Sequence, residues 1–593
     1  MITIKKDKSN RIYNSEEALF VTFPFSMERV AKIKSLPLRF YNPKEKSWEV
    51  PVEDYRQLLD VFEADEIDSH VVLNDSNSNT PKEENESHMP VKIEDIDYEF
   101  KTKPFNHQLE SFVYADTHDK FLLGDEQGLG KTKQAIDIAI DKKHKNGFKH
   151  CLIICGVNSL KWNWKKEIGI HSNESVRVLG ERTYKNGKPK EGTLKDRLED
   201  LENGMDEFFI IVNIESLRKP KQKKKVGRKF HKIELTETKK TQLAIMNELE
   251  KQSGNGDIDF VIFDEIHKAK NAQSQQGKAI HHLQPSFKLA LTGTPLMNKP
   301  EDLYNILKWL EVEKYSFYSF RNRYCEMGGY GGYEVVGYKN LKELQGKLDS
   351  VMLRRKKDEV LDLPDKIRSV DYVEMSAKQR QIYSDVLRGV KENITEIKLS
   401  NNPLSELIRL RQATAHTSIL SDKVNESAKM DRAYELVREL VDSGQKAVIF
   451  SNWTEVTDRA YEVFKEFNPA VVTGKSKNRE QEVERFQNDD KCNVIIGTIP
   501  AMGTGLTLNK ASTVIFLDKP WNRANTEQAE DRAHRIGTEG TVNVITLVCK
   551  GTIDERIEDI IYEKGELSDA LVEMDDNMLK KHDQSKLIDD LIF

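Results

Sequence analysis

The chain has 593 residues, of which 38% are hydrophobic and 32% are charged, and its formal net charge is -6. A chain of this length is too long for a single hydrophobic core, so we expect several domains. No segment is apolar for long enough to cross a bilayer, and the N-terminal stretch MITIKKDKSNRIYN lacks the apolar centre of a secretory signal. The slightly negative net charge excludes a protein that binds nucleic acid over its whole surface, but it allows a local basic cleft.

Five cysteines are scattered along the chain without a paired CxxC spacing. This spacing predicts neither a zinc site nor a disulfide framework, and it is typical of a reducing compartment. The compact length favours a bacterial or phage source and therefore a cytoplasmic location. A eukaryotic source would imply the nucleus.

Residues 1–72 are expected to form a small mixed α/β module. The runs ALFVTFPF, LRFYN and WEVPV are typical of short strands, and YRQLLDVFEA has helical periodicity. Phe40, Tyr41 and Trp48 could stack on unpaired bases, or they could fill the core of the small sheet. Residues 73–95 are polar and acidic without periodicity, which predicts a flexible linker.

Two later regions alternate β-rich runs with helical patterns, as expected for parallel sheets flanked by helices. Residues 96–296 contain FLLG, CLIICG, EFFIIVNIES, DFVIFDE and FKLALTGT, and residues 429–565 contain KAVIFSN, PAVVTG, NVIIGTI, TVIFLDK and VNVITLV. Helical periodicity dominates residues 297–428, and residues 566–593 are expected to form a helical tail. The predicted fold class is therefore α/β, with two parallel-sheet lobes, helical insertions and the small N-terminal module.

The first lobe contains a glycine-rich loop, DEQGLGKT, between an apolar run and a helical pattern. Gly128 and Gly130 let the backbone amides turn toward a phosphate chain, and the following helix adds the positive end of its dipole. Lys131 would reach the β and γ phosphates, and the Thr132 hydroxyl would bind Mg²⁺. The strict pattern has glycine where Asp125 stands, so the alternative is a turn before an exposed helix start.

Two further strand ends carry polar residues. DFVIFDEIHKAKN ends in Asp264, which could hold magnesium, and Glu265, which could polarise an attacking water. The alternative is an acidic strand end that caps a helix. In LALTGTP, Thr292 and Thr294 could form hydrogen bonds between the hydrolytic site and a moving second lobe.

The second lobe contributes QAEDRAHRIG. Gln528, Arg532 and Arg535 recur at helical spacing and are predicted to share one face of a helix. The planar guanidinium group suits the charge that develops on a γ-phosphate in the transition state. The alternative is a solvated basic helix face, but three motifs in the right order favour the nucleotide site.

From about Phe105 to Lys564, the order of motifs resembles that of the Swi/Snf-type ATPases, which are double-stranded DNA translocases of helicase superfamily two. In that family aspartate before the glycine pair is usual. VMLRRKKDEVLDLPDK and LRQATAHT resemble helical insertions particular to the family, and VIFSNW, TGKSKNREQEVERF and GTGLTLNKAS resemble its second-lobe motifs. The resemblance implies two RecA-like lobes with ATP between them.

The resemblance also implies a role for each motif residue. Gln108 would recognise adenine, and Gly503 and Gly505 would shape a loop that couples ATP to DNA. Arg523, Met502 and Thr507 depart from the usual pattern in the second lobe. The implied nucleotide-binding residues are Gln108, Asp125, Gly128, Gly130, Lys131, Thr132 and Gln528; the catalytic residues are Lys131, Asp264, Glu265, Arg532 and Arg535; the magnesium ligands are Thr132 and Asp264.

Within the family, three segments look closest to the HepA-related, annealing-helicase branch. They are the GLT of residues 505–507, FRNRYCEMGGYGGYEVVGYKNLKELQGKL, and the N-terminal LRFYNPKEKSWEVPVEDYRQLL. In that branch a small N-terminal module helps to select branched or fork DNA.

A dense basic run, KPKQKKKVGRKFHK, lies between two predicted strands of the first lobe. It could follow a duplex backbone, form a solvated hairpin tip, or act as a nuclear import signal. The candidate DNA contacts are Lys219, Lys223, Lys224, Lys225 and Arg228.

Together these features predict an ATP-dependent double-stranded DNA translocase that uses ATP and Mg²⁺. It would act as a monomer on double-stranded or branched DNA, and it would remodel protein–DNA complexes or DNA forks. One alternative is a strand-separating helicase of the same superfamily. The other is a DNA-binding scaffold whose nucleotide site serves only as a switch.

Overall fold

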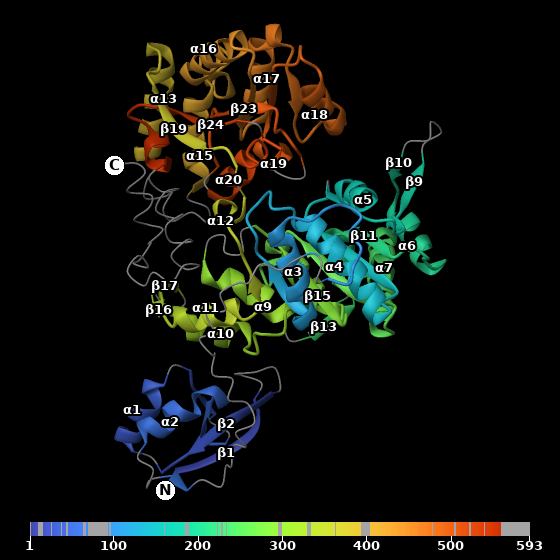
Figure 1. Cartoon of the computed structure of the whole chain (residues 1–593). Helices are drawn as coiled ribbons and strands as arrows, with labels where there is room; N and C mark the ends of the chain where they lie inside the picture. The colour runs from blue at the N-terminus through green and yellow to red at the C-terminus, as the bar shows by residue number, and fades with distance from the viewer. Residues whose placement is uncertain are drawn as a thin grey trace.

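A computed structural model gives the structure of the chain (Figure 1). No helix in the described part is long and apolar enough to span a membrane, and the five cysteines are buried free thiols. The described residues are 2–9, 16–24, 26–36, 38–42, 45–62, 67–68, 93, 96–158, 160–183, 189–221, 223–226, 229–232, 234–293, 299–328, 334–361, 363–392, 404–476, 478–502, 506–520, 523–535, 537–538 and 540–558.

The N-terminal module is a five-stranded sheet covered by two helices, and it lies beside α10 and α11 at the bottom of Figure 1. The strand order is β3-β4-β2-β1-β5, and the pairs are antiparallel except for β1 with β5. Alternate strand residues, such as Leu19 and Val21, are fully buried and form its core. The elements are β1 (Ile2–Ser9), β2 (Glu16–Thr22), α1 (Met27–Ser35), β3 (Phe40–Asn42), β4 (Ser47–Val50), α2 (Tyr55–Val61) and β5 (Ile67–Asp68).

The first lobe is built on a seven-stranded parallel sheet in the order β18-β6-β15-β14-β7-β11-β8. Its central strands are apolar runs because helices cover both faces of the sheet. The elements are α3 (Asn106–Thr117), β6 (Lys120–Leu123), α4 (Lys131–Asn146), β7 (His150–Cys155), α5 (Leu160–His171), β8 (Val176–Val178), α6 (Leu194–Glu202), β11 (Phe209–Asn213), α7 (Glu237–Gly254), β14 (Ile258–Asp264), α8 (Gln275–Ala279), β15 (Phe287–Leu291) and β18 (Met352–Leu353).

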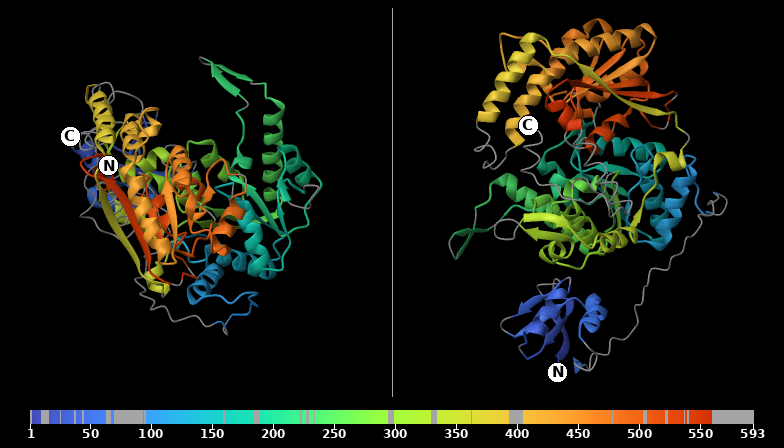
Figure 2. Two further views of the ribbon diagram at one scale, coloured as in Figure 1. Left: turned by 90° about the horizontal axis from the view of Figure 1, so that it is seen from above. Right: turned by 90° about the vertical axis from the view of Figure 1, so that its left-hand side faces the viewer.

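Two antiparallel hairpins leave this lobe, β9 (Glu181–Thr183) with β10 (Pro189–Glu191), and β12 (Lys223–Val226) with β13 (Lys229–Lys232). Figure 2 shows the second hairpin, in green, projecting away from the body of the lobe. The predicted basic run therefore contains a projecting hairpin.

The second lobe has a six-stranded parallel sheet in the order β19-β24-β23-β20-β22-β21. The predicted fold class is confirmed by these two parallel sheets and the small N-terminal module, whose sheet is mainly antiparallel. The elements are α16 (Ala428–Asp442), β20 (Lys446–Ser451), α17 (Thr454–Val463), β21 (Ala470–Val472), α18 (Arg479–Asn488), β22 (Val494–Thr498), α19 (Ile499–Met502), β23 (Ala511–Phe516), α20 (Arg523–Glu530) and β24 (Val542–Cys549).

The region between the lobes is divided between them. β18 extends the first sheet beside β6, and β19 extends the second sheet beside β24. Helices α13 and α15 pack on the second lobe, where Tyr383 and Leu410 share a buried cluster with Ile553. The remaining elements are α9 (Tyr304–Trp309), α10 (Phe317–Tyr324), β16 (Cys325–Gly328), β17 (Glu334–Tyr338), α11 (Leu341–Asp349), α12 (Lys357–Val360), β19 (Lys366–Val373), α13 (Ala377–Glu392) and α15 (Leu404–Ala415).

A buried ion cluster joins the N-terminal module to the first lobe. Arg323 of α10 lies 2.8 Å from Asp54, which precedes α2, and 2.8 Å from Glu343 of α11. The Asp54 side chain is 1% exposed. The ring of Phe40 also lies 5.9 Å from that of Tyr318, measured between centroids. The module is therefore docked on the lobe by side chains as well as by the chain itself.

Candidate nucleotide-binding site

The glycine-rich loop connects β6 to α4, as its sequence predicts. Gly128 and Gly130 have φ angles of +91° and +77°, a region that favours glycine. A β-carbon on Gly130 would lie 2.5 Å from Nε2 of Gln108, so this position is also closed to side chains by close packing. The loop ends at the N-terminus of a 16-residue helix, where backbone N–H groups and the helix dipole favour an anion.

Lys131 is the first residue of α4 and points back into the loop. Its Nζ donates hydrogen bonds to the main-chain oxygens of Asp125, at 2.7 Å, and Glu126, at 3.1 Å. Burial lowers the pKa of Lys131, whereas the nearby carboxylates of Glu265, Asp125 and Asp264 raise it. The lysine therefore lies among the acidic residues expected at a phosphate site, and Thr132 follows it in the first turn of the helix.

Gln108, on α3, is held against the loop by its side-chain amide. Its Nε2 donates to the main-chain oxygen of Leu129 at 3.3 Å, and its Oε1 accepts a hydrogen bond from the Phe105 backbone N–H at 3.0 Å. The structure thus places Gln108 beside Gly130. Its recognition of adenine stays a prediction.

Asp125 is held by residues that the sequence analysis did not connect with the loop. Its carboxylate is fully buried and accepts hydrogen bonds from Arg355 Nε and Nη2, at 3.0 and 2.6 Å, and from Gln134 Nε2 at 3.1 Å. Both oxygens are therefore already bound. Asp125 therefore ties the loop to Arg355 and Gln134, and its binding to a nucleotide stays a prediction.

Asp264 and Glu265 lie at the C-terminal end of β14, facing Lys131. Trp164 donates its indole N–H to Asp264 Oδ2 at 2.8 Å. Burial raises the pKa of Asp264, and the adjacent Glu265 carboxylate raises it further. Burial alone would also raise the pKa of Glu265, but His267, Lys131 and Arg532 lower it below its usual value. The backbone of Glu265 is in the left-handed region, with φ +55°, which is uncommon for residues other than glycine.

His267 links two of the predicted residues. Its Nδ1 lies 3.1 Å from Glu265 Oε2 and 3.1 Å from the Thr292 hydroxyl. Thr292 follows β15, so the contact connects the ends of two neighbouring strands. Sequence reasoning assigned no role to His267, which lies in DFVIFDEIHKAKN, or to Trp164, which lies in the stretch LKWNWKKEI of the same lobe.

The second lobe brings Gln528, Arg532 and Arg535 to the same site. Gln528 Nε2 donates to Glu265 Oε1 at 3.0 Å. Burial, together with the neighbouring Arg535, lowers the pKa of Arg532 to about 10, while Glu265 opposes this change. Arg535 Nη1 donates to the Thr507 hydroxyl at 2.8 Å, so Thr507 orients one of the two arginines.

The prediction that these three residues share a helix face is wrong. α20 ends at Glu530, and Arg532 and Arg535 lie in the turns that follow it. Arg532 instead folds back, and its Nε donates to the main-chain oxygen of Gln528 at 3.2 Å. The helical spacing failed because the chain leaves the helix before the first arginine.

Several predicted residues lie elsewhere or cannot be placed. Lys219 lies 2.7 Å from Glu250, and its contact with DNA stays a prediction. Lys223, Lys224 and Lys225 belong to β12, but their side chains lie outside the described part of the structure. Thr294, Gly503, Gly505 and Arg228 lie outside the described residues.

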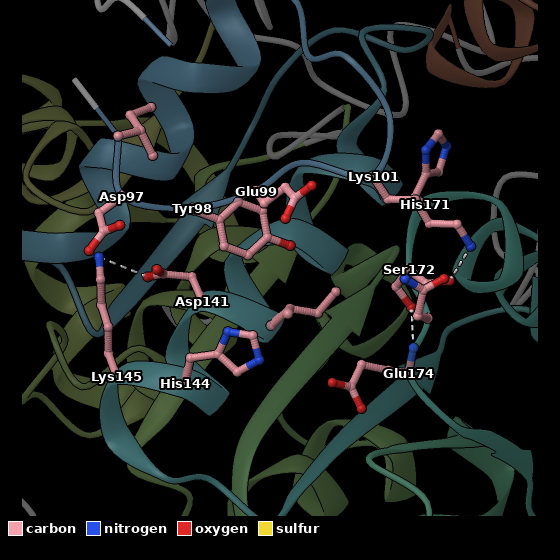
Figure 3. A pocket seen from close by; sticks show the side chains of 13 residues that line it. Asp97, Tyr98, Glu99, Lys101, Asp141, His144, Lys145, His171, Ser172 and Glu174 are labelled. Atoms are coloured by element: carbon pink, nitrogen blue, oxygen red, sulfur yellow. Dashed lines mark hydrogen bonds and ion pairs between the residues drawn. The ribbon is translucent and has the colours of Figure 1, made fainter. Parts of the chain in front are cut away.

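A separate pocket of about 720 Å³ lies on the first lobe between α4 and the residues that precede α3 (Figure 3). None of the predicted site residues lines it. Two of its lysines have local partners: Lys145 lies 3.1 Å from Asp141, and Lys101 Nζ donates to the main-chain oxygen of Ser172 at 2.6 Å. The candidate nucleotide site is the glycine-rich loop, because the predicted residues of both lobes gather there.

Three family models match the sequence. The SNF2-related domain matches residues 76–419, the helicase conserved C-terminal domain matches residues 428–537, and the HepA-related protein (HARP) model matches residues 19–75.

An uncharacterized ATP-dependent helicase of Mycoplasma pneumoniae is 28% identical over 548 residues, covering 90% of this chain and 47% of the relative. The SWI/SNF-related matrix-associated actin-dependent regulator of chromatin subfamily A-like protein 1 of Xenopus laevis is 26% identical over 569 residues, covering 91% of this chain and 52% of the relative. The chain thus spans about half the length of these relatives. Among solved structures, the Sulfolobus solfataricus SWI2/SNF2 ATPase core in complex with dsDNA is 23% identical and covers 82% of this chain and 95% of that chain, with a TM-score of 0.36.

Proposed function

The chain belongs to the SNF2-related family, and we therefore propose that it is a DNA-dependent ATPase that translocates on double-stranded DNA and remodels protein–DNA complexes or branched DNA. The matched models confirm the resemblance to Swi/Snf-type ATPases with a HepA-related N-terminal domain. One observation carries the proposal: Glu265 of the first lobe is contacted by His267 of its own lobe and by Gln528 of the other. A hydrolytic residue that is contacted by both lobes is consistent with an ATPase in which closure of the lobes controls hydrolysis.

The residues around Glu265 divide the chemistry of ATP hydrolysis between them. The loop amides, the α4 terminus and Lys131 would bind the phosphates, and Glu265 would orient the attacking water. Arg532 and Arg535 would approach the γ-phosphate from the second lobe and stabilise its transition-state charge.

Thr132 and Asp264 fit a magnesium ion, because a hydroxyl and a carboxylate are the oxygen donors that Mg²⁺ prefers. The proximity of Asp264 to a second buried carboxylate also favours a cation there. Thr132 and Asp264 would hold the ion, which would supply positive charge against the negative charge of the phosphates.

DNA would be held mainly through its phosphates, so we expect little sequence specificity. The projecting β12–β13 hairpin supplies a basic run that could follow a duplex. The N-terminal module would help to select forks, and its docking through Asp54 and Arg323 gives it a fixed position relative to the first lobe.

The first test is steady-state ATP hydrolysis by the intact chain and by Glu265→Gln, without nucleic acid and with single-stranded DNA, duplex DNA, forked DNA and RNA. If duplex or forked DNA stimulates ATP hydrolysis by the intact chain but not by Glu265→Gln, the result supports a DNA-dependent ATPase. A rate that ignores every nucleic acid supports a nucleotide-switched scaffold.

Translocation needs its own measurement. ATP-dependent displacement of a third strand from a triplex, without separation of the duplex, supports a translocase. Displacement of one strand of the duplex supports a strand-separating helicase instead. Equal stimulation by fork and duplex would contradict fork selection by the N-terminal module.

A further inference from the structure

One segment connects the two sheets and contacts both halves of the nucleotide site. It runs from the end of β18 to the start of β19, residues 354–365, and we call it the interlobe strap. β18 is an edge strand of the first sheet and β19 an edge strand of the second. The strap is therefore the covalent path between the lobes.

The first half of the strap is seated on the glycine-rich loop. Arg355 binds the buried Asp125 carboxylate, as described above, and the Glu126 backbone N–H donates to the Arg355 main-chain oxygen at 3.0 Å. The Lys357 backbone N–H in turn donates to Glu126 Oε2 at 2.8 Å. A β-carbon on Gly128 would lie 3.2 Å from Lys357 Cε, so the lysine side chain crosses the loop in contact with it.

The Lys357 ammonium group reaches the turn that carries the two arginines. Its Nζ lies 2.8 Å from Asp531 Oδ1 and donates to the main-chain oxygen of His534 at 3.0 Å. The side chains of Lys357 and Asp531 are 6% and 3% exposed, so the pair is shielded from water and salt. Asp531 and His534 are the immediate neighbours of Arg532 and Arg535.

We propose that Lys357 is a positioning residue for hydrolysis, which ties the phosphate loop to the arginine-bearing turn and so sets where Arg532 and Arg535 stand over the γ-phosphate. This inference rests on the proposed ATPase function. Lys357 joins the two groups directly, by a contact with Gly128 at one end and with Asp531 at the other. A shift of the loop is therefore transmitted to the turn.

Removal of the Lys357 charge should leave the turn folded. Asp531 keeps a second cation, Lys366, at 3.1 Å, and His534 Nε2 lies 2.7 Å from the main-chain oxygen of Pro364. The strap keeps its own contact with Glu126, because that hydrogen bond comes from the Lys357 backbone. We therefore expect the substitution to disturb the positions of Arg532 and Arg535 without unfolding the turn that carries them.

The test compares Lys357→Met, which keeps the aliphatic stem, with the intact chain. We expect kcat for DNA-stimulated ATP hydrolysis to fall at least tenfold, while KM for ATP stays within about twofold, because the phosphate-binding groups are untouched. Lys357→Arg, which restores a cation, should recover part of the rate. Lys378→Met, at a side chain that is 72% exposed, is the matched control.

A binding measurement separates this inference from the proposed function. Lys357→Met should bind a non-hydrolysable ATP analogue as the intact chain does, but it should bind ADP with aluminium fluoride, a transition-state mimic, at least tenfold more weakly. Failure of the intact chain to hydrolyse ATP would overturn the proposed function, yet the two affinities would still test Lys357. Equal loss of both affinities, or loss of neither, would overturn the positioning role. Lys357→Gln provides the same comparison if the methionine variant does not fold.

Discussion

The side-chain amide of Gln528 donates a 3.0 Å hydrogen bond to the Glu265 carboxylate, although the two residues belong to different lobes. The same carboxylate lies 3.1 Å from His267 through its other oxygen. Glu265 is 7% exposed, so each of these contacts acts in a region with little water to compete. The position of this carboxylate therefore depends on contacts from both lobes.

Gln528→Ala should slow hydrolysis without preventing nucleotide binding. The substitution removes one of two groups that orient Glu265, and a hydrogen bond to a charged group contributes about 1.5–3 kcal/mol. We expect kcat to fall by about 10- to 100-fold with little change in KM. The measurement is steady-state ATP hydrolysis on duplex DNA. Gln381→Ala, at an exposed glutamine on α13, is the control, and an unchanged kcat in Gln528→Ala would contradict the role of this contact.

Asp125→Ala should destabilise the first lobe. It leaves Arg355, whose side chain is 8% exposed, without its main carboxylate partner, and removal of one member of a buried ion pair typically costs about 3–5 kcal/mol. The urea concentration at the midpoint of unfolding, measured on the full-length variant, should be clearly lower than that of the unsubstituted chain. Glu237→Ala removes a carboxylate that is 82% exposed and should leave the midpoint nearly unchanged. Similar midpoints for the two variants would contradict a structural role for Asp125.

The sequence allowed prediction of the parts of the site that depend on neighbouring residues. Gly128, Gly130 and Lys131 lie within one loop, and Glu265 directly follows an apolar strand, so local pattern and strand order placed them correctly. The partner of Asp125 could not be found in this way, because Arg355 is 230 residues away in the chain and no periodicity relates the two.

The end of α20 was missed for a different reason. The spacing of Gln528, Arg532 and Arg535 fits a helix, but tertiary contacts override it. Glu530 and Asp531 are drawn to Arg368, Lys366 and Lys357 of the strap and β19, and the backbone turns there. Such a helix end has no glycine or proline signal, so only the packed structure reveals it.

Neutralisation of the basic hairpin should weaken DNA binding in a salt-dependent way. The paired strands β12 and β13 have the sequences KKKV and KFHK, so lysines occur on both strands of the hairpin. Changing Lys223, Lys224 and Lys225 to Gln should raise the DNA concentration needed for half-maximal ATPase stimulation. The slope of log affinity against log salt should become shallower by about 0.9 for each DNA phosphate that the variant no longer neutralises. Lys239→Gln with Lys240→Gln, on the first turn of α7, is the control. An unchanged salt slope would exclude the hairpin from the DNA interface.

The stability of the second lobe should fall in mild acid because of His416. This histidine is buried between α15 and the turn that follows, and its Nδ1 accepts a hydrogen bond from the Ser418 backbone N–H at 3.2 Å. Burial, aided by Arg459, lowers the pKa of His416 to about 4. The unfolded chain takes up this proton near its ordinary pKa of about 6.5. Stability is therefore fully present above about pH 6.5 and is lost as the pH falls toward 4.

His416→Asn should remove this pH dependence while keeping the cap, because an asparagine oxygen can accept the same backbone hydrogen bond. Uptake of one proton on unfolding changes the free energy of unfolding by about 1.4 kcal/mol per pH unit. Below pH 6.5, the free energy of unfolding of the intact chain should therefore fall more steeply than that of the variant, by up to this amount. Melting temperatures measured at pH 5.5 and pH 7.5 give the comparison, with exposed His144→Asn as the control. If His416→Asn and the intact chain lost the same number of degrees between the two pH values, protonation of this buried ring would not be what weakens the lobe.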